Sequence, residues 1–204
     1  TFIKSSENLL LFSYLNELTS LGKLLEVEYK KDKINRKAIT TIFNRQRELQ
    51  IIYEEKSNGL LVKHFIKANK PYIPIKYESI SNYLKNQTSN YFENLDFSDE
   101  ILQSSSLLLD KSLAYISSVV NKGFIKQKNY NYNIDKVVTK TKITNPDFQK
   151  VFLAKMWEKF VSYNQIKSAN YLAEKYLIPL ANQQNDKNLA LKLNQFKNLS
   201  IGNS

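Results

Sequence analysis

Apolar residues recur every three or four positions along most of this chain, which is the periodicity of amphipathic α-helices. The clearest stretch is residues 98–121. Ser98 stands where an N-cap belongs, acidic residues occupy the first turn, and Gly123 follows the last apolar position. The apolar positions are Ile101, Leu102, Leu108, Leu109, Leu113, Ile116, Val119 and Val120. We expect one continuous helix here.

Two long helices are predicted nearer the N-terminus, over residues 6–30 and 34–57. Ser6 is the expected N-cap of the first, which carries a seam of apolar residues with spacings of three and four. The seam consists of Leu11, Tyr14, Leu18, Leu21 and Leu25. Because the connection is short and polar, the two helices should form an antiparallel hairpin. A hairpin seam of this kind can be a docking surface, but more often it is core.

Two prolines, Pro71 and Pro74, mark the expected domain boundary. Each proline fixes its own φ and disfavours helical backbone in the residue before it. We therefore assign residues 1–70 to the hairpin and a short helix at 59–69, and residues 71–204 to a helical bundle, unless both parts pack as one domain.

The second part is predicted to be an irregular bundle. Its expected helices cover residues 77–93, 98–121, 146–163, 166–178 and 186–199. Residues 122–145 have the weakest pattern and are expected to be mostly loop, with a short helix at 133–141. The strongest apolar faces should meet in one core, formed by Leu109, Leu113, Ile116, Trp157 and Phe160. The chain has only four Gly and four Pro, which argues against a β-sandwich or barrel. The predicted fold class is all-α.

The composition limits the possible chemistry. No apolar run approaches the ~18 residues that a membrane span needs, so no transmembrane segment is expected. The absence of Cys excludes disulfides, thiolate catalysis and cysteine metal sites. The first residue is Thr1, which suggests a processed or cut product.

The formal net charge of +11 raises the possibility of a polyanion partner. Lysines alternate with Phe124, Tyr130 and Tyr132 over residues 122–142, a pattern that a groove for stacked bases could have. A solvated loop has the same pattern. The basic residues are mostly Lys rather than Arg, and no known nucleic-acid motif frames them, so a nucleic-acid partner is not favoured.

We predict no catalytic, cofactor-binding or metal-binding residue. His64 is the only histidine, and a lone histidine without Cys partners is usually a surface or hydrogen-bonded residue. Asp96, Asp99 and Glu100 are better explained by helix capping than by a calcium loop. The motif Ser-x-x-Lys at 20–23 lies inside the apolar seam without a supporting second motif, so we interpret it as chance.

Two groups of residues resemble a known family. The first comprises Tyr91, Phe92, Asp96, Phe97, Ser98, Asp99, Leu102 and Tyr115. The second comprises Lys167, Ala169, Ala173, Glu174, Lys175 and Tyr176. This pattern is similar to the helical region that precedes the thioredoxin domain in multidomain TlpA/ResA-like thiol–disulfide oxidoreductases of Gram-negative envelopes. The last residues, 201–204, resemble the lead-in to such a domain.

The resemblance implies a non-catalytic module of a periplasmic oxidoreductase, which positions the redox domain or docks a partner protein. The expected partner is then the adjoining thioredoxin domain or another protein, and the expected location is the periplasm or cell envelope. This chain cannot perform thiol exchange itself, because it has no Cys-x-x-Cys motif. Two alternatives remain: a helical adaptor subunit of an envelope complex, and a basic polyanion-binding protein.

Overall fold

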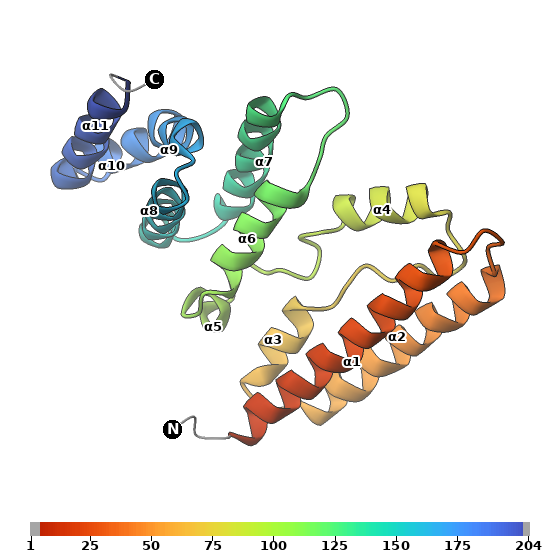
Figure 1. Cartoon of the computed structure of the whole chain (residues 1–204). Helices are drawn as coiled ribbons and strands as arrows, with labels where there is room; N and C mark the ends of the chain where they lie inside the picture. Colours follow the sequence, from red (N-terminus) through yellow and green to blue (C-terminus); the bar gives the residue numbers. More distant parts are fainter. Residues whose placement is uncertain (1–4, 202–204) are drawn as a thin grey trace. The chain divides into compact units, whose positions relative to one another are not determined.

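The computed structural model describes residues 5–201, and these form helices without any strand (Figure 1). The all-α prediction is therefore confirmed. The elements are α1 (Ser6–Tyr29), α2 (Arg36–Lys56), α3 (Val62–Ala68), α4 (Ile80–Ser89), α5 (Glu100–Gln103), α6 (Leu107–Ser118), α7 (Lys126–Thr141), α8 (Pro146–Ser162), α9 (Ile166–Leu172), the π-helical turn η1 (Ala173–Leu177), α10 (Ile178–Gln183) and α11 (Lys187–Ile201). The chain divides into two compact units, one up to Leu102 and one from Gln103 onward.

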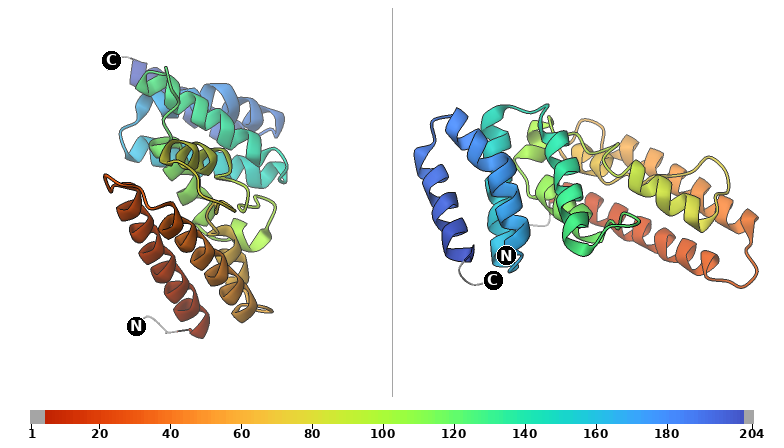
Figure 2. Two further views of the ribbon diagram at one scale, coloured as in Figure 1. Left: turned by 90° about the vertical axis from the view of Figure 1, so that its right-hand side faces the viewer. Right: turned by 90° about the horizontal axis from the view of Figure 1, so that it is seen from above.

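In the first unit, α1 and α2 lie side by side and run antiparallel, as both views in Figure 2 also show. Ser5 rather than Ser6 caps α1, because its hydroxyl accepts a hydrogen bond from the backbone N–H of Asn8 at 3.3 Å. Asn35 caps α2 by accepting from the N–H of Ala38 at 3.0 Å. Side-chain caps thus begin both helices of the hairpin.

The core of this unit lies between the hairpin and the elements that cover one of its sides. Tyr14 and Phe43 are fully buried in it, and the hydroxyl of Tyr14 donates a 2.6 Å hydrogen bond to Gln50. The buried members are Tyr14, Leu21, Leu25, Ile39, Ile42, Phe43, Leu49, Tyr53, Val62, Ile66 and Tyr83. Helix α3 and Tyr83 of α4 therefore complete a core that the hairpin alone could not close.

The proline segment is part of this core packing and does not separate the two units. Tyr72 and Ile73 pack against the buried cluster, and the guanidinium of Arg47 donates to the carbonyl of Pro74. The units instead divide after Leu102, well beyond the boundary expected after residue 70. Proline makes the backbone extended, but the apolar side chains beside it decide that this extended segment lies on the hairpin.

The prediction of one helix over residues 98–121 is wrong, because α5 and α6 are separate. Asp99, and not Ser98, caps α5, since its carboxylate accepts from the N–H groups of Ile101 at 2.9 Å and Leu102 at 3.1 Å. Three serines, 104–106, interrupt the helix. Serine side chains compete for backbone hydrogen bonds, and here the hydroxyl of Ser105 accepts from the N–H of Leu107 at 3.2 Å.

The second unit packs α6 against α7 and α8, and α7 against α9. Leu109, Ile116, Trp157 and Phe160 are all buried, as the sequence predicted. Leu113 is only half-buried and was wrongly placed fully inside. Other fully buried side chains here include Leu108, Ile134, Leu153 and Met156.

Residues 122–145 were wrongly predicted to be mostly loop, since most of them form the sixteen-residue helix α7. The pattern was hidden because two of its buried positions are asparagines, Asn129 and Asn133. The amide of Asn129 donates to the carbonyl of Val119 at 2.7 Å, and Asn133 donates to Ile116 and Val119 at 3.2 and 2.8 Å. These amides satisfy carbonyls at the end of α6, which would otherwise lack partners.

Helices α8 and α10 end alike, each with a left-handed asparagine. Asn164 and Asn185 follow them with φ of 54° and 57°, in the left-handed region that asparagine tolerates. The next N–H closes each end: Gln165 donates to the carbonyl of Phe160 and Asp186 to that of Ala181, both at 2.8 Å.

Candidate functional site

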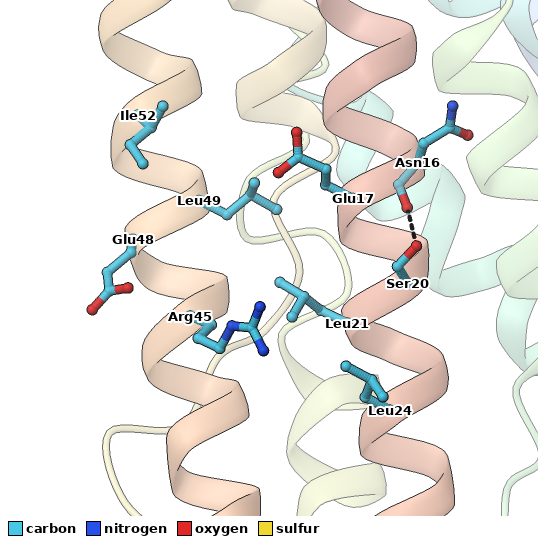
Figure 3. Close-up of a pocket in the computed structure, with 9 residues that line it drawn as sticks. All are labelled: Asn16, Glu17, Ser20, Leu21, Leu24, Arg45, Glu48, Leu49 and Ile52. Atoms are coloured by element: carbon cyan, nitrogen blue, oxygen red, sulfur yellow. Dashed lines mark hydrogen bonds between the residues drawn. The ribbon is translucent and has the colours of Figure 1, made fainter.

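One side of the hairpin carries an open groove with a volume of about 380 Å³, which we call the hairpin groove (Figure 3). It is lined by Asn16, Glu17, Ser20, Leu21, Leu24, Arg45, Glu48, Leu49 and Ile52. Its floor consists of the buried Leu21 and Leu49, whose side chains point between the two helices. Leu24 and Ile52 are 47% and 45% exposed beside this floor. The groove therefore presents an apolar surface between two polar edges.

The two helices build this groove with the same spacing. Residues 17, 20, 21 and 24 of α1 and residues 45, 48, 49 and 52 of α2 each follow the steps i, i+3, i+4 and i+7. This spacing keeps side chains on one face of a helix. The repeated spacing was readable from the sequence. The groove itself could not be read, because a seam of this kind is closed when another element covers it.

The edge of the groove on α1 becomes apolar at both ends. Leu9 and Val27 are exposed and lie seven residues from Asn16 and Ser20 respectively, so all four share one face. A ligand that followed the hairpin axis would thus meet Leu9, a polar central part and then Val27.

Two polar groups of the groove make hydrogen bonds within the hairpin. The hydroxyl of Ser20 donates to the carbonyl of Asn16 at 2.9 Å, inside its own helix. The carboxylate of Glu17 accepts a 2.6 Å hydrogen bond from Tyr53. Burial and this hydrogen bond raise the pKa of Tyr53 to about 12, so its hydroxyl stays a donor at neutral pH.

His64 and Asp99, which no sequence pattern connects, lie together in the first unit. Nδ1 of His64 is 2.6 Å from Oδ2 of Asp99, while Oδ1 of the same carboxylate caps α5. Burial alone would raise the pKa of Asp99. The hydrogen bonds from His64, Leu102 and Ile101 outweigh burial and hold this pKa below its ordinary value. The pair joins α3 to the start of α5, which is the structural role expected for a hydrogen-bonded histidine.

A second polar cluster surrounds Asp135 of α7. Its carboxylate accepts from the hydroxyl of Tyr171 at 2.8 Å and of Tyr176 at 2.7 Å, and the ammonium of Lys175 lies 2.9 Å away. Burial and the bond to Asp135 raise the pKa of Tyr176 to about 12. The hydrogen bonds that the ammonium of Lys175 donates to Tyr171 and Asp135 raise the pKa of Lys175.

Two of these partners stand on the π-helical turn η1, a geometry often found at functional sites. Both carboxylate oxygens of Asp135 already accept hydrogen bonds from protein groups. The cluster therefore connects α7 to α9 and η1 and offers little capacity for a ligand. Lys175 and Tyr176 belong to the residues that carry the family resemblance.

The lysines of α7 cover the aromatic rings that the sequence suggested for base stacking. The rings of Phe124 and Tyr132 meet edge to face with centroids 5.3 Å apart. Lys128 lies over Phe124 at 5.1 Å, and Lys136 lies over Tyr132 at 5.3 Å. A stacked base would have to displace these ammonium groups, so the arrangement does not favour a base-stacking groove.

Within residues 5–201, no three His, Asp or Glu side chains gather in a way that could hold a metal ion. In the same residues, no helix has the length and apolar character to cross a bilayer. Comparison of the chain with protein-family models, with curated proteins and with solved structures gave no significant match.

Proposed function

We propose that this chain is a non-catalytic helical module that binds a partner protein in the hairpin groove. The observation that carries the proposal is the pair of exposed side chains Leu24 and Ile52 above the apolar floor of Leu21 and Leu49. Exposed apolar surface with a polar border is typical of protein interaction sites.

An amphipathic helix is the ligand that best fits this groove. The groove runs between two antiparallel helices, and a third helix with its own three- and four-residue apolar spacing would complete a three-helix arrangement. At the edge formed by α2, Arg45 and Glu48 carry opposite charges, so they favour an acidic and a basic residue, respectively, beside the apolar stripe of that helix.

The resemblance to TlpA/ResA-like oxidoreductases supports a narrower form of the proposal. The partner is then the thioredoxin domain that follows in the same protein, or a protein that this domain acts on, in the periplasm. Reading the coding sequence beyond Ser204 tests this form. A Cys-x-x-Cys motif within roughly 50 residues supports it, because thioredoxin domains place this motif early. A downstream sequence without that motif would leave the helical adaptor as the better description.

The groove is tested by the double variant Leu24→Asp/Ile52→Asp, with Ile75→Asp as the control at an exposed apolar residue outside the groove. Where the thioredoxin domain is encoded downstream, it is the probe, titrated into residues 1–204 by calorimetry. We expect the double variant to weaken binding at least about ten-fold, because two charges would enter an apolar contact. Equal binding by the double variant and the control would contradict the groove as the docking site.

A further inference from the structure

The loop between α6 and α7, residues 119–125, carries two of the most exposed apolar side chains among the described residues. Val120 is 82% exposed and Ile125 is 75% exposed. Between them Gly123 adopts a φ of 84°, and the N–H of Phe124 donates to the carbonyl of Asn121 at 3.2 Å. We call this segment the α6–α7 loop. It presents aliphatic side chains on both flanks of a tight turn.

This loop is fixed at its base. The backbone N–H of Asn121 donates to Oδ1 of Asn129 at 2.8 Å, and its side-chain amide donates to Oδ1 of Asn133 at 2.9 Å. Phe124 is half-buried against Tyr132. A hydrogen-bonded turn thus fixes the backbone that carries Val120 and Ile125. Binding through these side chains should therefore cost little further conformational entropy.

Along the chain, the charged residues of the loop and its flanks have one sign. No acidic residue occurs between Lys111 and Ile134, and Lys122, Lys126 and Lys128 are exposed beside the apolar pair. The next acid along the chain, Asp135, is already paired with Lys175. The segment therefore combines exposed aliphatic groups with three exposed lysines and contains no acid of its own.

We propose that the α6–α7 loop binds the surface of an anionic lipid bilayer. Val120 and Ile125 enter the boundary between headgroups and acyl chains, and the three lysines contact the anionic headgroups. Loops and helices that bind membranes from one side combine apolar insertion with electrostatic attraction in this way. Such binding is peripheral and does not depend on the hairpin groove.

The aliphatic residues favour lipid over the other anionic partners. Valine and isoleucine have no π face for a base and no hydrogen-bonding group for a base edge. The nearby rings that could stack are covered by Lys128 and Lys136. An acidic protein would satisfy the lysines, but acyl chains also remove both aliphatic side chains from water without requiring a shaped pocket.

The test is sedimentation of the whole chain with phosphatidylcholine vesicles that contain or lack phosphatidylglycerol. Two variants separate the contributions: Val120→Ser/Ile125→Ser removes the aliphatic groups, and Lys122→Gln/Lys126→Gln/Lys128→Gln removes the charge. We expect the lysine variant to lose about 100-fold in affinity for anionic vesicles, since each lysine near such a surface contributes about five-fold. We expect the serine variant to lose at least about ten-fold.

Each variant has a matched control. Ile143→Ser removes an aliphatic side chain that is 72% exposed beyond the other end of α7. The variant Lys37→Gln/Lys67→Gln/Lys76→Gln removes the same number of charges from exposed positions in the first unit. Both controls should bind like the parent, and circular dichroism should show that all variants remain helical. The variant Ile125→Trp places a fluorophore in the loop itself. After the emission of the parent has been subtracted, the emission maximum of this tryptophan should shift to shorter wavelength when anionic vesicles are added.

Four outcomes would overturn the proposal. These are the absence of binding to anionic vesicles, equal binding to vesicles without phosphatidylglycerol, unchanged binding by the serine variant, and tighter binding to a single-stranded oligonucleotide than to vesicles. The last result would support the nucleic-acid alternative, and unchanged binding by the serine variant would show attraction by charge without insertion.

Discussion

The side-chain amide of Asn133 donates a 2.8 Å hydrogen bond to the backbone carbonyl of Val119, the C-cap of α6. Asn133 is fully buried, at 0% exposure, on a side of α7 that also buries Asn129, Ile134 and Val137. A buried polar group without a hydrogen-bond partner would destabilise the fold. Here the amide donates to backbone carbonyls at the end of α6, where a helix has no N–H groups of its own left to bond them. The asparagine therefore connects the end of α6 to α7, together with Asn129.

Replacing Asn133 by Leu should destabilise the second unit by about 1–3 kcal/mol, because the carbonyl of Ile116 would lose this donor and that of Val119 would keep only the amide of Asn129. Urea unfolding followed by the fluorescence of Trp157, the only tryptophan, reports on this unit. Asn198→Leu, at an exposed position of α11, is the control and should change the free energy of unfolding little. Equal effects of the two changes would mean that the amide of Asn133 has no special role.

The difference in burial between Ile116 and Leu113 predicts different costs of truncation on one helix. Ile116→Ala should cost about 2–5 kcal/mol, since the side chain is nearly fully buried. Leu113→Ala should cost less than about 2 kcal/mol, because this side chain is already partly exposed to water. The same fluorescence measurement compares them, and a larger cost at Leu113 would contradict the burial of α6 described above.

The pair of His64 and Asp99 predicts a loss of stability in acid. The pKa of Asp99 lies below its ordinary value of 3.8, so the folded chain holds this proton more weakly than the unfolded chain does. The stabilisation is therefore present above that ordinary value and is lost as the pH falls through the folded pKa. NMR titration of the Asp99 carboxyl should show the low pKa, and His64→Ala should raise it. A pKa that stays the same in His64→Ala would exclude the hydrogen bond from His64 as a cause.

The cluster around Asp135 predicts a loss of stability in base. The folded chain keeps the proton of Tyr176 up to a pKa of about 12, above the ordinary value of 10.0, so stability should fall as the pH rises between these values. Asp135→Asn should lower the pKa of Tyr176 only part of the way, since burial is the larger cause. NMR of the labelled tyrosine ring measures both. A pKa at the ordinary value in the parent would contradict the cluster.

Residues 98–121 show what the periodicity of apolar residues can predict and what it cannot. Ile101, Leu108 and Ile116 fit a helical repeat, and each does lie in or beside a helix. The repeat could not show that the serines at 104–106 would divide the stretch, because serine is compatible with a helix and also with a turn. Hydrogen bonds such as that from Leu107 to Ser105 decide between the two, and they depend on where the flanking helices are held.

By itself, the sequence determined the helical class, most helix positions and the absence of thiol chemistry. These follow from local spacing, caps and residue types, which act within a few residues. Only the tertiary structure decided that Tyr72 and Ile73 lie on the hairpin, that Asn129 and Asn133 complete the end of α6, and that the groove beside Leu24 and Ile52 stays open. The physical reason is that burial and hydrogen-bond satisfaction depend on residues far apart in the chain, whose meeting no local pattern encodes.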